Sequence, residues 1–179
     1  MPRVKVPFHE QLEESDCTVA CVMMIMLWAR DTYGDVAQFT YDELKKILRW
    51  NRDGTPMENV PLMNRQNILR QHRHQPKFFF AFATGLGFIW QEIELKRPMI
   101  AQLEQTFPDG VLRHSVVVTG HTSDKTKIYC NDPLKTRPIT VPTDRFQKQW
   151  NAFFRTCAHV IVEEQETLEL DTFTEDRAE

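Results

Sequence analysis

Residues 15–29, SDCTVACVMMIMLWA, decide the fold of the first half of this chain. Ser15 and Asp16 are typical N-cap residues, and nearly every residue after them is apolar. A helix that is apolar on all sides is buried on all sides, so the segment predicts a central core helix. Its apolar run, residues 19–29, is too short to cross a bilayer, which needs about 20 residues. We therefore expect no membrane insertion.

Polar segments and further helices surround this core helix. Residues 1–15 are mostly polar and contain two prolines, which predicts an extended lead-in. Gly34 interrupts the chain, and Thr40 then caps residues 41–50, whose apolar side chains lie on one helical face. We expect a third helix over residues 60–71.

The second half of the chain has the pattern of β-strands. Short segments rich in β-branched and aromatic residues are bounded by Gly, Pro or Asp. The predicted strands are residues 78–84, 98–104, 115–120, 127–132, 137–141 and 158–164. A helix capped by Thr143 over residues 143–153 interrupts them. Because helices come first and strands follow, we expect an α+β class with an antiparallel sheet, in one domain over residues 1–162.

The charge of the chain is concentrated at its C-terminal end. With 22 basic and 25 acidic residues, the net charge is −3. Residues 163–179 hold eight acids and one base and are expected to be a disordered tail, which leaves +4 for the rest. No long basic run is present, so we expect no nucleic-acid partner. The N-terminus lacks the apolar core of a signal peptide, so we expect a cytoplasmic protein with free thiols.

Cys17 lies at the first turn of the predicted core helix, directly after its cap. Free backbone N–H groups and the helix dipole stabilise an anion there, which favours a thiolate. Its position alone is equally well explained by a small buried core residue, as we expect for Cys21 one turn later. A nucleophilic thiol also needs a base, and the base needs an orienting group.

The strand pattern suggests His114 as the base and Asp132 as its orienting group. His114 begins HSVVVTG and Asp132 ends KIYCND, with a short polar turn between the two segments. A hairpin symmetric about Ser123 places residues 114 and 132 opposite each other, about 4.5–5.5 Å apart at Cβ. Pro133 holds Asp132 in an extended conformation and ends the strand. A carboxylate beside an imidazole orients a catalytic base.

Gln11 lies six residues before Cys17, at the end of the lead-in. Its side-chain amide can donate to the carbonyl oxygen of a group that Cys17 attacks. The Gln11 amide and the Cys17 backbone N–H together predict an oxyanion hole. The alternative is that Gln11 is solvated, as glutamine in a polar segment usually is.

These residues resemble the papain-like cysteine peptidases of the bacteriocin-processing (double-glycine leader peptidase) family. HEQLEESDCTVACVMMIMLW is similar to the family's Gln…Asp-Cys-Gly-x-Ala-Cys opening, and the resemblance continues in TYDELKKIL, DGTP, KRPMIAQLE, RHSVVVTG, NDP and FQKQW. It implies a papain-like fold, with a helical half packed on an antiparallel β-sheet half and the active site in the cleft between them. It further implies a peptide or protein substrate, no cofactor, and four site residues: Gln11 in the oxyanion hole, Cys17 as nucleophile, and His114 and Asp132 completing the triad.

Two features depart from the family pattern. Thr18 follows the nucleophile where the family has Gly, and we expect its β-branched side chain to narrow the approach to the thiolate. The membrane-spanning and ATP-binding regions to which leader peptidases are fused are not found in this sequence. We therefore expect a free-standing relative, for which the resemblance does not imply a double-glycine substrate.

Two other interpretations remain open at this point, and a third is disfavoured. The same triad can attack a glutamine side-chain amide, as in deamidases and transglutaminases, because the cleft and the resolving nucleophile decide the product. A relative that keeps the fold without the activity is a peptide-binding module. A metal site from Cys17, Cys21, Cys157 and His159 lacks the two-residue spacing of structural zinc sites, so we expect no metal. The sequence makes no prediction of the oligomeric state.

Overall fold

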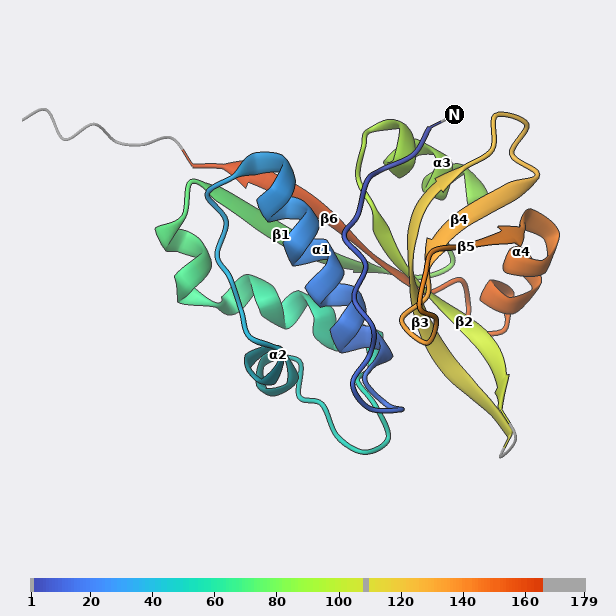
Figure 1. Ribbon diagram of the computed structural model, residues 1–179, viewed down its shortest axis with the longest axis horizontal. Helices are drawn as coiled ribbons and strands as arrows, with labels where there is room; N and C mark the ends of the chain where they lie inside the picture. Colours follow the sequence, from blue (N-terminus) through green and yellow to red (C-terminus); the bar gives the residue numbers. More distant parts are fainter. Residues whose placement is uncertain (1, 108–109, 166–179) are drawn as a thin grey trace, which may run out of the picture.

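The computed structural model describes residues 2–107 and 110–165, and its first half is helical (Figure 1). Its elements are α1 (Cys17–Tyr33), α2 (Tyr41–Ile47) and the 3-10 helices η1 (Met57–Arg65) and η2 (Asn67–Gln71). The core helix α1 runs past its predicted end to Gly34, whose φ of 89° favours glycine. Thr40 and Glu43 form a capping box that starts α2, which packs on α1.

The described strands form one antiparallel sheet in the order β1-β6-β2-β3-β4-β5. They are β1 (His74–Ala81), β2 (Met99–Phe107), β3 (Gly110–His121), β4 (Lys127–Asn131), β5 (Ile139–Pro142) and β6 (Cys157–Glu164). β6 pairs with β1 along its whole length, but with β2 only from Met99 to Ala101. A short seam therefore joins a β1-β6 part of the sheet to a β2–β5 part.

The helices are divided between these two parts of the sheet. η1 packs on β1, whereas α3 (Leu86–Glu94) packs on β3 and α4 (Thr143–Asn151) packs on β2, β4 and β5. Figure 1 shows α1 and α2 on one side of the molecule and β3, β4, β5 and α4 on the other, with α1 contacting β3 between them. The predicted α+β class, with a helical half and an antiparallel-sheet half, is confirmed. None of the helices in the described ranges is long and apolar enough to cross a membrane.

Two helical segments differ from the prediction. Residues 60–71, predicted as one helix, form the end of η1 and the whole of η2, with Pro61 inside η1. The break lies at Gln66, whose extended backbone, with ψ of 117°, separates the two 3-10 helices. The helix α3 was not predicted at all, because Gly85 at its N-cap gives no side-chain capping signal.

The extended lead-in is held against the β3–β4 hairpin. The Val4 N–H donates to the Thr119 carbonyl at 2.7 Å. Gly120 permits this close approach, because a Cβ at that position would lie 2.7 Å from the Pro2 carbonyl oxygen. The hairpin thereby guides the lead-in toward the start of α1.

The first two residues of the predicted acidic tail belong to the sheet instead. Glu163 and Glu164 belong to β6, and Glu164 forms an ion pair with Arg73. The rest of the predicted tail, residues 166–179, lies outside the described residues.

Candidate active site

His114 and Asp132 share one face of the β3–β4 hairpin, although not through the predicted register. Beyond a β-bulge, Val117 pairs with Asn131. If this register continues by one position, Asp132 lies opposite Val116. Val116 is two residues from His114 along β3. Since side chains alternate along a strand, residues two apart point to the same face.

The β-bulge itself produces this arrangement. Nearer the turn, Gly120 pairs with Tyr129. If that register continued, Asp132 would lie opposite Val117 and on the other face from His114. One extra residue in β3 shifts the pairing by one position and restores the shared face. The predicted symmetric hairpin is therefore wrong in register, although it put the two side chains on one face.

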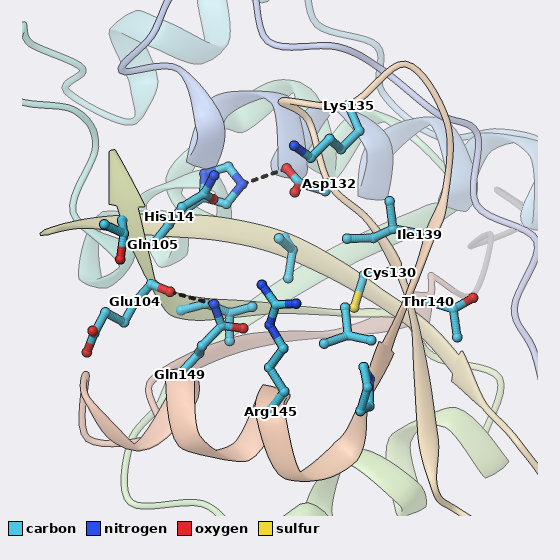
Figure 2. A pocket seen from close by; sticks show the side chains of 15 residues that line it. Glu104, Gln105, His114, Cys130, Asp132, Lys135, Ile139, Thr140, Arg145 and Gln149 are labelled. Carbon is cyan, nitrogen blue, oxygen red and sulfur yellow. Dashed lines mark hydrogen bonds and ion pairs between the residues drawn. The ribbon is translucent and has the colours of Figure 1, made fainter. Parts of the chain in front are cut away.

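His114 and Asp132 form a buried hydrogen-bonded pair. His114 Nε2 is 2.6 Å from Asp132 Oδ1 (Figure 2). The Leu134 N–H donates to the same oxygen at 3.0 Å. Burial lowers the pKa of His114, but hydrogen bonds and charges from Asp132 and Cys17 outweigh it and raise this pKa to about 9. Burial raises the pKa of Asp132, whereas His114 and the Leu134 N–H hold it below its ordinary value. Since Nε2 is bonded to Asp132, Nδ1 is the nitrogen left for the thiol.

Cys17 is the first residue of α1 and, of the four cysteines, the one that is not buried. Partial removal from water raises the pKa of its thiol. A hydrogen bond with His114, the charge of His114 and hydrogen bonds from Ser115 outweigh this effect and lower the pKa below its ordinary value. The free N–H groups at the helix start also favour the anion. This arrangement supports a thiolate–imidazolium pair, the activated form of a cysteine nucleophile.

We expect a bell-shaped pH dependence for acyl transfer. The lowered pKa of Cys17 extends the thiolate to lower pH than an ordinary thiol allows, and His114, whose pKa is raised to about 9, loses its proton above that value. Acyl transfer should therefore decline above about pH 9, whereas alkylation of Cys17 by iodoacetamide, which needs no proton donor, should not. Parallel rate measurements check this. An alkylation rate that rises only near the ordinary thiol pKa would contradict the pairing.

Cys21, one turn along α1, is fully buried, and burial raises the pKa of its thiol well above the ordinary value. Cys21→Ala should lower the free energy of unfolding by about 1–2 kcal/mol through lost packing and leave turnover unchanged. Iodoacetamide at neutral pH, followed by mass spectrometry, should show modification of Cys17 first. Faster modification of Cys21 would show that the wrong thiol has been assigned.

Gln11 lies just before α1, but its side-chain N–H groups are already used. Nε2 donates to the carbonyls of Glu13 and Glu14, both at 2.8 Å, and the Gln11 backbone N–H donates to the Pro133 carbonyl at 3.0 Å. Within the described residues, the buried Gln11 Oε1 has no hydrogen-bond partner. In this state Gln11 fixes the loop before Cys17 and presents no free side-chain N–H.

Thr18 does not narrow the approach to the thiolate, contrary to the prediction. Its side chain is 1% exposed, donates to the Thr55 carbonyl at 3.0 Å and shares a hydrogen bond with Ser115 Oγ at 2.9 Å. The hydroxyl lies in the interior because it finds two polar partners there. Thr18 thus connects the turn at Thr55 to β3, which carries His114.

Asp16, predicted as a helix cap, is a buried ion-pair partner instead. Its side chain is fully buried, makes no cap hydrogen bond, and has Oδ2 3.1 Å from Lys45 Nζ. Lys45 also contacts Glu13 Oε1 at 2.6 Å and lies 4.2 Å from the centre of the Trp50 ring. This cluster ties the loop before Cys17 to α2. Sequence reasoning missed it because Lys45 looks like any solvated lysine on an amphipathic helix.

A pocket of about 400 Å³ adjoins the His114–Asp132 pair (Figure 2). Its apolar lining comes from the β2–β5 part of the sheet: Leu103, Val116, Cys130, Ile139 and Val141. Its polar and charged lining includes Glu104, Gln105, Lys135, Arg145 and Gln149. No local pattern in the sequence marks this lining, because its residues come together from β2, β3, β4, β5, α4 and the turn after β4.

The residues considered for a metal site do not form one cluster. Cys17 and Cys21 belong to α1, whereas Cys157 and His159 belong to β6. His159 Nδ1 instead lies 3.6 Å from Glu92 Oε2. In residues 2–107 and 110–165, no group of three or more His, Cys, Asp or Glu side chains is arranged to hold a metal ion.

Comparisons with known proteins bear on the family and on the fold. A sequence profile of the Peptidase C39 family matches residues 5–159. A crystal structure described as a C39-like peptidase from Bacillus anthracis is similar with a TM-score of 0.64 and 14% sequence identity, covering 90% of this chain and 96% of that one. At this identity the likeness shows the fold alone. No curated protein sequence matches the chain significantly.

Proposed function

Because this chain belongs to the Peptidase C39 family, we propose that it is a cysteine peptidase in which Cys17, His114 and Asp132 form the catalytic triad. The family supports a cysteine peptidase-like function and, with it, a peptide or protein substrate. The observation that carries the residue assignment is the 2.6 Å hydrogen bond between His114 and Asp132, beside a thiol of lowered pKa.

In the proposed reaction, the Cys17 thiolate attacks the carbonyl carbon of a peptide bond and forms a tetrahedral intermediate. The His114 imidazolium gives its proton to the leaving nitrogen, the C–N bond breaks, and a thioester remains. Neutral His114 then takes a proton from water, whose oxygen attacks the thioester and releases the thiolate. Asp132 orients the ring through Nε2 and stabilises the cation that forms again.

The proposed oxyanion hole combines the Cys17 backbone N–H with the Gln11 side chain. Cys17 is the first residue of α1, and the first N–H groups of a helix have no partner within it. To reach the substrate oxygen, Gln11 Nε2 must release the carbonyl of Glu13 or Glu14. The exchange is favourable because a hydrogen bond to an oxyanion is roughly twice as strong as one to a neutral carbonyl.

Gln11→Ala should lower kcat/KM by about 10²–10³ if the amide stabilises the oxyanion. The loss should fall on kcat, because that interaction forms only in the transition state. Steady-state kinetics and a melting curve check this, with Leu12→Ala at the exposed neighbouring position as control. A loss carried by KM alone, or matched by a large fall in melting temperature, would mean that Gln11 only holds the loop.

Mass spectrometry of a peptide library incubated with wild type and with Cys17→Ala tests the proposed function. Bond cleavage by the wild type alone supports a peptidase. A mass gain of about one dalton on glutamine, without cleavage, identifies a deamidase that uses the same thiol. Binding of peptides without any change of mass contradicts both enzymes and identifies a peptide-binding module.

A further inference from the structure

The pocket beside His114 and Asp132 has chemistry that the proposed triad does not use. Its volume of about 400 Å³ falls within the range of ~300–1,000 Å³ typical of ligand pockets. Apolar side chains of the sheet line it, and Lys135 and Arg145 bring two cations to it. His114 belongs to the proposed triad and also lines the pocket. A peptide held at Cys17 therefore passes close to the pocket.

Arg145 and Lys135 bring their positive charges to the lining of the pocket. Figure 2 shows Arg145 extending from α4 into the pocket and Lys135 approaching from the side of Asp132. Two acids also line it: Asp132, which is bonded to His114, and Glu104, whose carboxylate points away from Arg145. Across residues 2–107 and 110–165, neither cation forms an ion pair within 4 Å.

We propose that this pocket is a substrate subsite for an acidic side chain close to the scissile bond, and that Arg145 determines the preference. The methylene groups of a Glu side chain can lie on the apolar lining while its carboxylate reaches the guanidinium. Arg binds a carboxylate through two parallel N–H···O bonds, and the low dielectric of an apolar surface strengthens them. The subsite rests on the proposed function, because it requires a peptide at Cys17.

The two cations of the pocket also determine which side chains are disfavoured there. A Lys side chain is repelled by Lys135 and Arg145. A Gln side chain has the size and shape of Glu but not its charge. A comparison of Glu with Gln therefore isolates the electrostatic part of recognition.

Peptides that differ only by Glu, Gln or Lys within two residues of the scissile bond test the subsite. We expect kcat/KM for Glu to exceed that for Gln by about ten- to a hundredfold. Arg145→Glu should reverse the order in favour of Lys. Lys148→Glu makes the same charge change on α4 but lies outside the pocket lining, so it should keep the wild-type order.

Binding of the same peptides to Cys17→Ala separates the subsite from the reaction. If peptides are cleaved but Arg145→Glu leaves the order of rates unchanged, the subsite is wrong and the peptidase stands. If no peptide is cleaved, yet Glu peptides bind more tightly than Gln peptides and lose this advantage in Arg145→Glu, the peptidase is wrong and the acid-binding site stands. Equal binding and cleavage of Glu and Gln peptides, or no binding of any, overturns the subsite.

Discussion

Cys17→Ser is expected to reduce kcat/KM by at least about 10³-fold while leaving the fold nearly intact. The pKa of a hydroxyl is far above that of a thiol, so His114 cannot hold Ser as an anion beside its ring. The fold tolerates the change because Cys17 is partly exposed and Ser is favourable at a helix start. Peptide kinetics and thermal melting of the same preparation measure the two effects separately, and the melting temperature should change by only a few degrees.

The matched control for this variant is Cys21→Ala, on the same helix. It should show the opposite result, with lower stability and normal turnover, because Cys21 packs in the core. Unchanged turnover in Cys17→Ser would remove the basis for the triad, and for the subsite that depends on it.

Asp132→Ala is expected to lower kcat/KM by about 10²–10⁴. The change removes both the acceptor of the His114 Nε2–H and the charge that stabilises the imidazolium, so the ring loses its orientation and its proton. It also leaves the partly buried Leu134 N–H without its acceptor, which should cost about 1 kcal/mol of stability. Kinetics at a temperature well below the melting point separate the two losses.

Asp132→Asn distinguishes orientation from charge. Its oxygen can still accept from His114, but without the charge the upper limb of the pH profile should move from about pH 9 toward the ordinary histidine value of about 6.5. The matched control is Asp124→Asn in the β3–β4 turn, where Asp124 accepts from the Thr126 N–H. Its activity should be normal. Loss of activity in Asp124→Asn with normal activity in Asp132→Asn would show that the wrong carboxylate has been assigned.

Several elements could be predicted because their signals lie between neighbours in the sequence. The all-apolar run after Cys17 indicates the core helix, and Thr40 with Glu43 indicates the start of α2. The strands follow from short segments rich in β-branched residues between turn residues. Each of β1–β6 is overlapped, at least in part, by one predicted strand. Where such local signals are weak, as at Gly85 before α3, the prediction failed.

The candidate site was predictable in its residue types but not in its geometry. Residue spacing and the resemblance singled out Cys17, His114 and Asp132, and the structure brings their side chains together. Spacing could not reveal the bulge between Val118 and Gly120, because an unpaired extra residue leaves no mark on the alternation of a strand that is buried on both faces. Nor could it show that both N–H groups of Gln11 are engaged.

The sequence by itself determined the α+β class, the buried central helix and the chemical groups available at its start, because helix periodicity, strand patterning and capping act between residues close together in the chain. Only the tertiary structure decided that Asp16 pairs with Lys45, that Thr18 lies in the interior, and that Arg145 reaches the pocket beside His114. Each of these depends on where two distant segments meet. That meeting is set by the packing of the whole core and by the register of paired strands, which no local pattern encodes.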